Sequence, residues 1–156
     1  MKIKAKKITA ENFSSFGKAL VEATGDPTSQ AVDYKFWSDI INYNIEGDTE
    51  IGICTVYKQQ LLKINEMERH NNTPEILIPI DGPFVLPVLN DKNNPEQTDV
   101  FVVEVGQAIA INKKVWHGAC VPFNKDECSY FVIFKKGTPF NDVEKTKLPE
   151  ITIISK

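Results

Sequence analysis

One acidic stretch around His70 holds residue types that could bind a metal ion. Glu68 lies two residues before His70, and Glu75 follows after a short polar segment. Residues two apart in a β-strand face the same side, so Glu68 and His70 would point together into the interior while Arg69 points away. A turn over residues 71–74 would bring Glu75 back toward the same point. These side chains would form part of a site for a divalent cation.

The other histidine, His117, ends a segment whose spacing is informative. Gly106, Asn112, Lys114 and His117 follow one another at intervals of six, two and three positions. This spacing resembles the second motif of the cupin superfamily, G(X)5PXG(X)2H. Asn112 and Lys114 stand where that motif usually has proline and glycine.

The stretch that begins at Glu68 resembles the other cupin motif, HXH(X)4E(X)6G. Glu68 takes the place of the first histidine, and His70, Glu75 and Gly82 match in register. Cupins are small jelly-roll barrels. The resemblance implies that both motifs meet around one metal ion inside the barrel, with Glu68, His70, Glu75 and His117 as its ligands.

Short strands separated by turn residues must position these motifs. We expect strands near residues 2–8, 50–57, 61–68, 75–80, 83–89, 98–105, 107–111, 118–123, 128–135 and 150–154. Thr9 stands where it would cap a short helix over residues 11–16, which Gly17 would end. Antiparallel sheets bury one face against another sheet or close on themselves. We therefore expect an all-β fold, a cupin-type jelly-roll barrel with a short N-terminal helix, as a single domain over residues 1–156.

The composition agrees with a β-rich domain that binds neither nucleic acid nor membrane. Ile and Val supply 30 residues against 15 for Leu and Ala, which favours strands over helices. The net charge is −3, so no surface for tracking phosphates is expected. No apolar run approaches the roughly 18 residues of a membrane span, and the N-terminus lacks a secretory apolar region. We therefore expect a soluble, cytoplasmic protein.

The three cysteines, Cys54, Cys120 and Cys128, are widely spaced and form no CxxC pair. Their odd number and spacing argue against a disulfide framework and against a thiolate zinc site. We expect them to be buried apolar residues.

Three runs along the chain carry a closer resemblance. E-M-E-R-H at 66–70, I-L-I-P-I-D-G at 76–82 and V-W-H at 115–117 resemble, in that order, the ureidoglycolate lyase family of cupins. The likeness extends to I-T-A-E-N-F-S-S-F-G at 8–17, near the N-terminus. The resemblance implies a homodimeric, cytoplasmic enzyme of purine and allantoin breakdown. Such an enzyme is an amidine-type lyase, which breaks the C–N bond of ureidoglycolate and releases urea and glyoxylate.

The chemistry that this resemblance implies is the breakdown of a hemiaminal. Loss of the hydroxyl proton lets the carbonyl form as the C–N bond breaks, and the departing nitrogen takes up a proton. One divalent metal ion (Mn, Fe, Ni or Zn) would acidify the hydroxyl as a Lewis acid. Glu66 is the expected catalytic residue that moves the proton.

The residues that would bind the substrate carboxylate differ from the family pattern. The lyases are expected to have an arginine on the strand before the first motif, where this sequence reads C-T-V-Y-K, and the only arginine here is Arg69. Tyr57, Lys58 and Lys113 are the candidates to replace it, and Trp116 is a candidate for lining the pocket mouth. Because Arg and Lys are not equivalent at a bidentate site, the pocket could suit a different small acid.

Two other functions therefore stay open. The first is another metal-dependent cupin isomerase or lyase that acts on a small sugar acid or hydroxy acid. The second is a cupin module that binds a small molecule without turnover.

Overall fold

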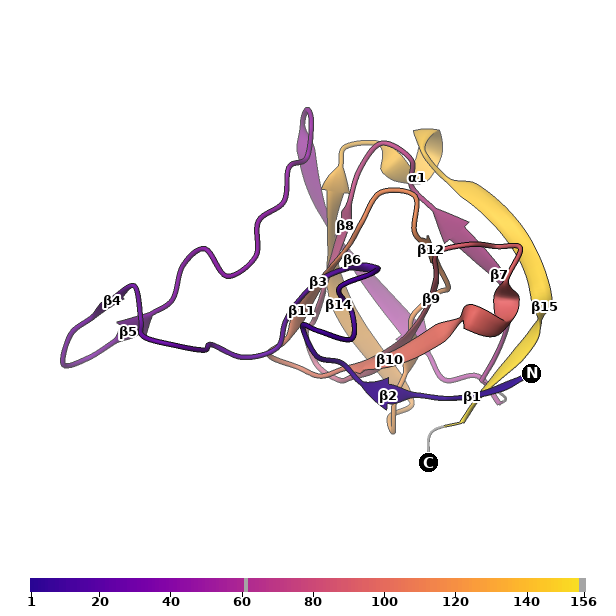
Figure 1. Cartoon of the computed structure of the whole chain (residues 1–156), viewed down its shortest axis with the longest axis horizontal. Coiled ribbons are helices and arrows are strands. Elements are labelled where there is room, and N and C mark those ends of the chain that lie inside the picture. Colours follow the sequence, from indigo (N-terminus) through magenta and orange to yellow (C-terminus); the bar gives the residue numbers. More distant parts are fainter. Residues whose placement is uncertain (61, 155–156) are drawn as a thin grey trace.

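Two β-sheets face each other and make up most of the molecule (Figure 1). This computed structural model describes residues 1–60 and 62–154. The strands are β1 (Lys2–Lys4), β2 (Lys6–Lys7), β3 (Gly17–Leu20), β4 (Ser29–Gln30), β5 (Lys35–Phe36), β6 (Thr49–Tyr57), β7 (Lys63–Arg69), β8 (Glu75–Pro79), β9 (Phe84–Leu89), β10 (Asp99–Val103), β11 (Ala108–Ile111), β12 (Trp116–His117), β13 (Val121–Pro122), β14 (Glu127–Lys135) and β15 (Glu144–Ile154). The helical segments are a 3-10 turn, η1 (Pro95–Gln97), and an α-helix, α1 (Thr138–Asn141).

The larger sheet has the strand order β1-β15-β7-β12-β9-β10-β2, and β13 also pairs with β9. The smaller sheet has the order β3-β11-β8-β14-β6. A separate hairpin, β4-β5, extends away from the barrel (Figure 1). Neighbouring strands often come from distant parts of the sequence, as the crossing connections of a jelly roll require. The expected all-β jelly-roll barrel is confirmed.

An inner cluster of apolar side chains fills the space between the two sheets. Its fully buried large members include Phe13, Phe84, Phe101 and Ile109. The rings of Phe13 and Phe101 meet edge to face, with centroids 5.3 Å apart. Burying one such side chain contributes about 1.5–3 kcal/mol. This cluster therefore fixes the spacing of the sheets from which the site residues project.

Strand β9 is buried on both faces, which gives the molecule a second, outer cluster. All six residues of β9 are buried. Leu86 packs in the inner cluster, whereas Val85 packs in the outer one. Trp116 of β12 also lies in the outer cluster. Because successive side chains of a strand alternate, the next residue, His117, faces the inner side.

Residues 10–16 form consecutive turns where the sequence predicts an N-terminal helix. The expected cap is present, since the N–H of Asn12 donates to Thr9 Oγ1 at 3.0 Å and the N–H of Thr9 donates to Asn12 Oδ1 at 2.9 Å. Gly17 already belongs to β3, so the segment is too short for helical hydrogen bonds to offset the cost of nucleation. The α-helix of the described residues, α1, lies near the other end of the chain.

Strand β15 starts at Glu144, well before the position near residue 150 that the sequence predicts. Exposed Lys145 and Lys147 alternate with half-buried Thr146 and Leu148 in its first half. The polar composition of this half gives no sequence signal for a strand, which forms because its backbone pairs with β7. The consequence for the site is that β15 brings lysines beside the acidic residues of β7.

Smaller differences concern strand ends. The strand expected at 118–123 is replaced by the two short strands β12 and β13, and β3, β4 and β5 are not predicted at all. The strand expected at 61–68 starts at Lys63, and residue 61 lies outside the described residues. Neither helical segment in the described part of the chain has the length and apolar character needed to cross a membrane.

Candidate functional site

Glu68, His70 and His117 converge from two neighbouring strands of the larger sheet. Glu68 lies on β7 with His70 just beyond its end, and His117 of β12 pairs directly with Glu68. One ligand atom from each of the three residues lies within 4.8 Å of the other two. Both histidines are only 5% exposed. The inward direction predicted for Glu68 and His70 is therefore what the structure has.

Glu75 approaches the same point from the smaller sheet, where it begins β8. Its Oε2 atom lies 3.0 Å from His117 Nε2, and its Oε1 atom lies 3.9 Å from His70 Nε2. The shorter approach lacks hydrogen-bond geometry, so Glu75 Oε2 and both Nε2 atoms are buried without a partner. Buried polar atoms without partners are costly unless something binds them.

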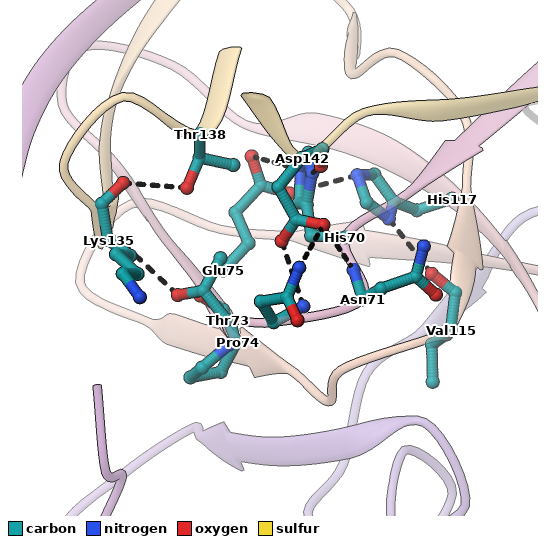
Figure 2. A network of polar contacts seen from close by, with 11 residues as sticks. His70, Asn71, Thr73, Pro74, Glu75, Val115, His117, Lys135, Thr138 and Asp142 are labelled. Carbon is teal, nitrogen blue, oxygen red and sulfur yellow. Dashed lines mark hydrogen bonds and ion pairs between the residues drawn. The ribbon is translucent and has the colours of Figure 1, made fainter. Parts of the chain in front are cut away.

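The Nδ1 atoms of both imidazoles face backbone carbonyls (Figure 2). His70 Nδ1 lies 2.7 Å from the Asp142 carbonyl oxygen, and His117 Nδ1 lies 3.2 Å from the Val115 carbonyl oxygen. A carbonyl oxygen can only accept a hydrogen bond, so a neutral imidazole in this position carries its N–H on Nδ1 and keeps its lone pair on Nε2. Metal-bound histidines have this arrangement.

The carboxylate of Asp142 fixes the carbonyl that holds His70. It accepts hydrogen bonds from the backbone N–H of Asn71 at 3.0 Å and of Asn72 at 2.8 Å. The side-chain amide of Asn72 donates to it as well, at 2.9 Å. These bonds tie the connection between α1 and β15 to the turn after β7 (Figure 2). Asp142 thus positions His70 without facing the cluster itself.

The electrostatics of the cluster keep Glu75 charged. Burial by itself would raise the pKa of Glu75, but the imidazoles of His117 and His70 outweigh burial and hold this pKa at about 2. Burial would lower the pKa of His70, whereas Glu75 and the Asp142 carbonyl raise it, and the net result is a raised pKa. The cluster therefore contains an anionic carboxylate between two imidazoles.

One departure from the cupin motif, Lys114, lies in the loop before His117. Lys114 stands at the usual glycine position and has φ +69°, in the left-handed region that favours glycine. Its backbone N–H donates to the His70 carbonyl oxygen at 2.7 Å. This bond fastens the two motifs to each other beside the cluster.

Two cavities border the cluster, and Glu68 and Lys145 line both. The first has a volume of about 370 Å³ and is also lined by Cys54, His70, Glu75, Tyr130, Val132, Phe134, Pro139 and Val143. The second has a volume of about 270 Å³ and is also lined by Lys63, Ile64, Asn65, Glu66, Met67, His117 and Ala119. A larger cavity of about 680 Å³ lies by the N-terminal turns, away from all four predicted ligands, so size does not locate the chemistry.

Glu66, the predicted catalytic residue, lies beside the cluster in the second cavity. Its side chain is 47% exposed, and its Oε1 atom accepts a hydrogen bond from Lys145 Nζ at 3.1 Å. The structure therefore brings Glu66 near Glu68 and His117. Its part in proton transfer stays a prediction.

Tyr57, Lys58 and Lys113 line neither cavity, contrary to the sequence-based expectation. Tyr57 is 62% exposed because the alternation along β6 places it on the outer face of the sheet. Lys58 pairs with Asp126 at 3.4 Å, and Lys113 Nζ lies 3.8 Å from a carboxylate oxygen of Glu46. Their ammonium groups are thus directed to other surface partners.

Trp116 does not line the pocket mouth either. It is 1% exposed and belongs to the outer cluster. The guanidinium carbon of Arg69 lies 4.5 Å from the centroid of a Trp116 ring, and the same guanidinium pairs with Glu144 at 2.7 Å. The only arginine therefore lies on the outer face, where alternation along β7 places it.

Sequence reasoning missed three residues of the first cavity that have a thiol, hydroxyl or ammonium group: Cys54, Tyr130 and Lys145. Burial, together with nearby Cys120 and Cys54, raises the pKa of Tyr130 far above its usual value, so its hydroxyl stays protonated. The three cysteines are free, and Cys120 and Cys128 are buried as expected, whereas Cys54 is half-buried. Inward alternation marks Tyr130 and Cys54 as interior, but no motif distinguishes them from packing residues.

The donor set fits a divalent transition-metal ion. Two imidazole nitrogens and two carboxylates form a mixed, fairly hard set, which suits Mn, Fe, Ni or Zn without choosing among them. The unpaired Nε2 atoms of His70 and His117 and the fixed Nδ1 contacts are what such a site requires.

Comparison with known proteins assigns the family. The sequence model of the ureidoglycolate lyase family matches residues 1–155. A ureidoglycolate lyase from Mesorhizobium japonicum is 24% identical over 153 residues, which cover 92% of this chain and 91% of that protein. Among solved structures, oxalate decarboxylase from Bacillus subtilis is 17% identical with a TM-score of 0.47, over 65% of this chain and 24% of that one. A mutant of that enzyme matches at 17% identity with a TM-score of 0.44, over 83% of this chain and 35% of its own. This chain thus spans well under half of the decarboxylase. The family model, in contrast, matches nearly the whole length of this chain, which therefore belongs to the ureidoglycolate lyase family.

Proposed function

We propose that this chain releases urea from ureidoglycolate and leaves glyoxylate, with a divalent metal ion held by Glu68, His70, Glu75 and His117. The observation that carries the proposal is the buried meeting of two Nε2 atoms and Glu75 Oε2, none of which has a hydrogen-bond partner. Membership of the family supports the choice of substrate. A bound ion would act as a Lewis acid toward the α-hydroxy acid and acidify its hydroxyl.

Glu66 is the residue that we assign to proton transfer. It lines the same cavity as Glu68 and His117, and half of its side chain is open to solvent. Its carboxylate accepts the hydroxyl proton of the substrate as the C–O bond becomes a carbonyl. The C–N bond breaks with its electron pair going to nitrogen, and the proton passes from Glu66 to that nitrogen as urea leaves. No proton is gained or lost overall.

The fixed imidazoles keep the site ready for this reaction. Backbone carbonyls hold the Nδ1 sides of His70 and His117, so neither ring has to reorganise when substrate binds. The protonated hydroxyl of Tyr130 in the first cavity is a hydrogen-bond donor for polar groups of the substrate.

Urea release from ureidoglycolate tests the reaction and the metal separately. Purified protein is assayed as isolated, after chelation, and after chelation followed by Mn, Fe, Ni or Zn, with a blank for spontaneous breakdown. The proposal expects activity to fall after chelation and to return with at least one ion. Equal activity after chelation would refute the metal assignment, and no urea release with any ion would refute the reaction.

One observation favours testing a second reaction class in parallel. The only arginine, Arg69, is held on the outer face and cannot grip a carboxylate bidentately in the cavities. A panel of small hydroxy acids and sugar acids therefore accompanies ureidoglycolate. Turnover of another acid without urea release would assign the site to another metal-dependent lyase or isomerase. Ligand binding without any turnover would assign it to a binding module.

A further inference from the structure

Lys145 is the cation placed between the two cavities beside the cluster. It lines both of them, as Glu68 does. In the pairing of β15 with β7, Lys145 lies directly opposite Glu68. Lys145 of β15 and Glu68 of β7 therefore place opposite charges side by side where the two cavities meet.

The ammonium group of Lys145 is charged, accessible and only partly used. Its side chain is 59% exposed, and Nζ donates one hydrogen bond to Glu66 Oε1 at 3.1 Å. The hydrogen bond to Glu66 and the charges of Glu66 and Glu68 raise the pKa of Lys145. An ammonium has three hydrogens to donate, so two remain for a ligand.

The other two cations near the site, Lys63 and Arg69, form ion pairs with other carboxylates. Lys63 lines the second cavity only, and its Nζ atom pairs with Glu150 at 2.8 Å. Arg69 lies on the outer face against Glu144. Among the described residues, Lys145 is thus the cation that both cavities share.

We propose that Lys145 binds the carboxylate of the hydroxy-acid substrate and positions it beside the cluster. This inference rests on the proposed function, because it concerns the same cavity and the same class of substrate. The contact is a single ammonium-to-carboxylate pair, which orients the substrate less strictly than a bidentate arginine. An incoming carboxylate competes with Glu66 for Lys145, so substrate binding also releases Glu66 to accept a proton.

Because the substrate carboxylate and Glu66 compete for Lys145, two substitutions should change the affinity for the carboxylate in opposite directions. Lys145→Met removes the cation and keeps the length of the stem. Glu66→Gln removes both the competing anion and its repulsion of the ligand. The first substitution weakens carboxylate binding by about tenfold, as for a partly exposed charged hydrogen bond, and the second strengthens it.

Direct binding of glycolate tests the proposal without relying on catalysis. Glycolate and its neutral analogue glycolamide are titrated by NMR into metal-free and zinc-loaded protein. Lys63→Met is the matched control, because it removes a lysine of the second cavity that is not shared. Lys145→Met is expected to lose glycolate affinity and keep its glycolamide affinity, Lys63→Met to behave as wild type, and Lys145→Arg to retain binding.

Three results would overturn the assignment. They are wild-type glycolate affinity in Lys145→Met, equal losses for glycolate and glycolamide, and no glycolate binding by the wild type. Failure of the proposed function gives a different pattern, in which glycolate binding depends on Lys145 but ureidoglycolate yields no urea. Where urea is released, the KM of Lys145→Met rises by a larger factor than its kcat falls.

Discussion

Removal of the Asp142 carboxylate should weaken metal binding although Asp142 is not a proposed ligand. The carboxylate accepts three hydrogen bonds from Asn71 and Asn72, and these hold the carbonyl that orients His70. Asp142→Ala removes all three and leaves every donor atom of the cluster in the chain. The connection between α1 and β15 then becomes free to move, and the His70 ring moves with it.

The size of the effect follows from these bonds. A hydrogen bond to a partly exposed group contributes about 1 kcal/mol, so three bonds that are not fully additive contribute about 1–3 kcal/mol. Loss of the group behind a metal-bound histidine typically costs about 10–100-fold in metal affinity. That range corresponds to about 1.4–2.8 kcal/mol, which agrees with the sum of the bonds.

Competition with a chromophoric chelator measures the zinc affinity of each variant. Asp91→Ala is the matched control, because the Asp91 carboxylate also accepts three hydrogen bonds, from Asn93 and Asn94, in a loop outside both cavities. We expect zinc affinity to fall in Asp142→Ala and to stay unchanged in Asp91→Ala. Unchanged zinc affinity in folded Asp142→Ala would refute the positioning role derived for this carboxylate.

Three further predictions concern the scaffold. Gly17→Ala should destabilise the fold by about 1–3 kcal/mol, because a Cβ at this position would collide with the Ala110 backbone, and a thermal midpoint equal to the wild type would contradict this. Phe101→Ala empties part of the inner cluster and should cost about 3–5 kcal/mol in urea unfolding, so a loss below 1 kcal/mol would show that the cluster does not hold the sheets. A hydrogen bond from the Ser129 N–H lowers the pKa of Asp81 in the folded state. The ionised carboxylate therefore stabilises the fold fully above the pKa of Asp81 in the unfolded chain, and this stabilisation is lost as the pH falls through its pKa in the folded state. As the pH falls below about 4, the ordinary pKa of an aspartate, the stability of Asp81→Asn should therefore fall less steeply than that of the wild type, and parallel curves would exclude this contribution.

Period-two alternation made the direction of the site residues predictable from sequence. Along β7 and the residue that follows it, alternation turns Glu68 and His70 inward and Arg69 outward, and the structure has this arrangement. The resemblance of two segments to the cupin motifs implied that His117 would join them. The same alternation along β6 and β12 places Tyr57 and Trp116 away from the cavities, in contrast to the roles expected for them.

Lys145 could not be predicted because its strand does not look like one. The first half of β15 reads as a polar segment, and the pairing that places Lys145 opposite Glu68 joins residues far apart in the chain. Contacts at such sequence separation leave no local pattern. The prediction of an N-terminal helix was wrong for a related reason. The Thr9 cap forms, but tertiary pairing with β11 places Gly17 in β3 and ends the capped segment before a helix can develop.

The homodimer and the cytoplasmic location, which the resemblance and the composition suggested, stay predictions. Light scattering of the purified chain measures the oligomeric state, with twice the mass of 17.6 kDa expected. A mass of one chain across the concentration range would contradict the dimer.

The metal site is tested most directly by an anomalous difference map from crystals of the zinc-loaded protein, recorded on both sides of the zinc absorption edge. The account predicts one strong peak inside the barrel, at about 2.0–2.2 Å from Nε2 of His70 and of His117 and bound also by the carboxylates of Glu68 and Glu75. A zinc peak elsewhere would contradict the account. So would a map without a zinc peak in which the Glu75 carboxylate forms a hydrogen bond with His117.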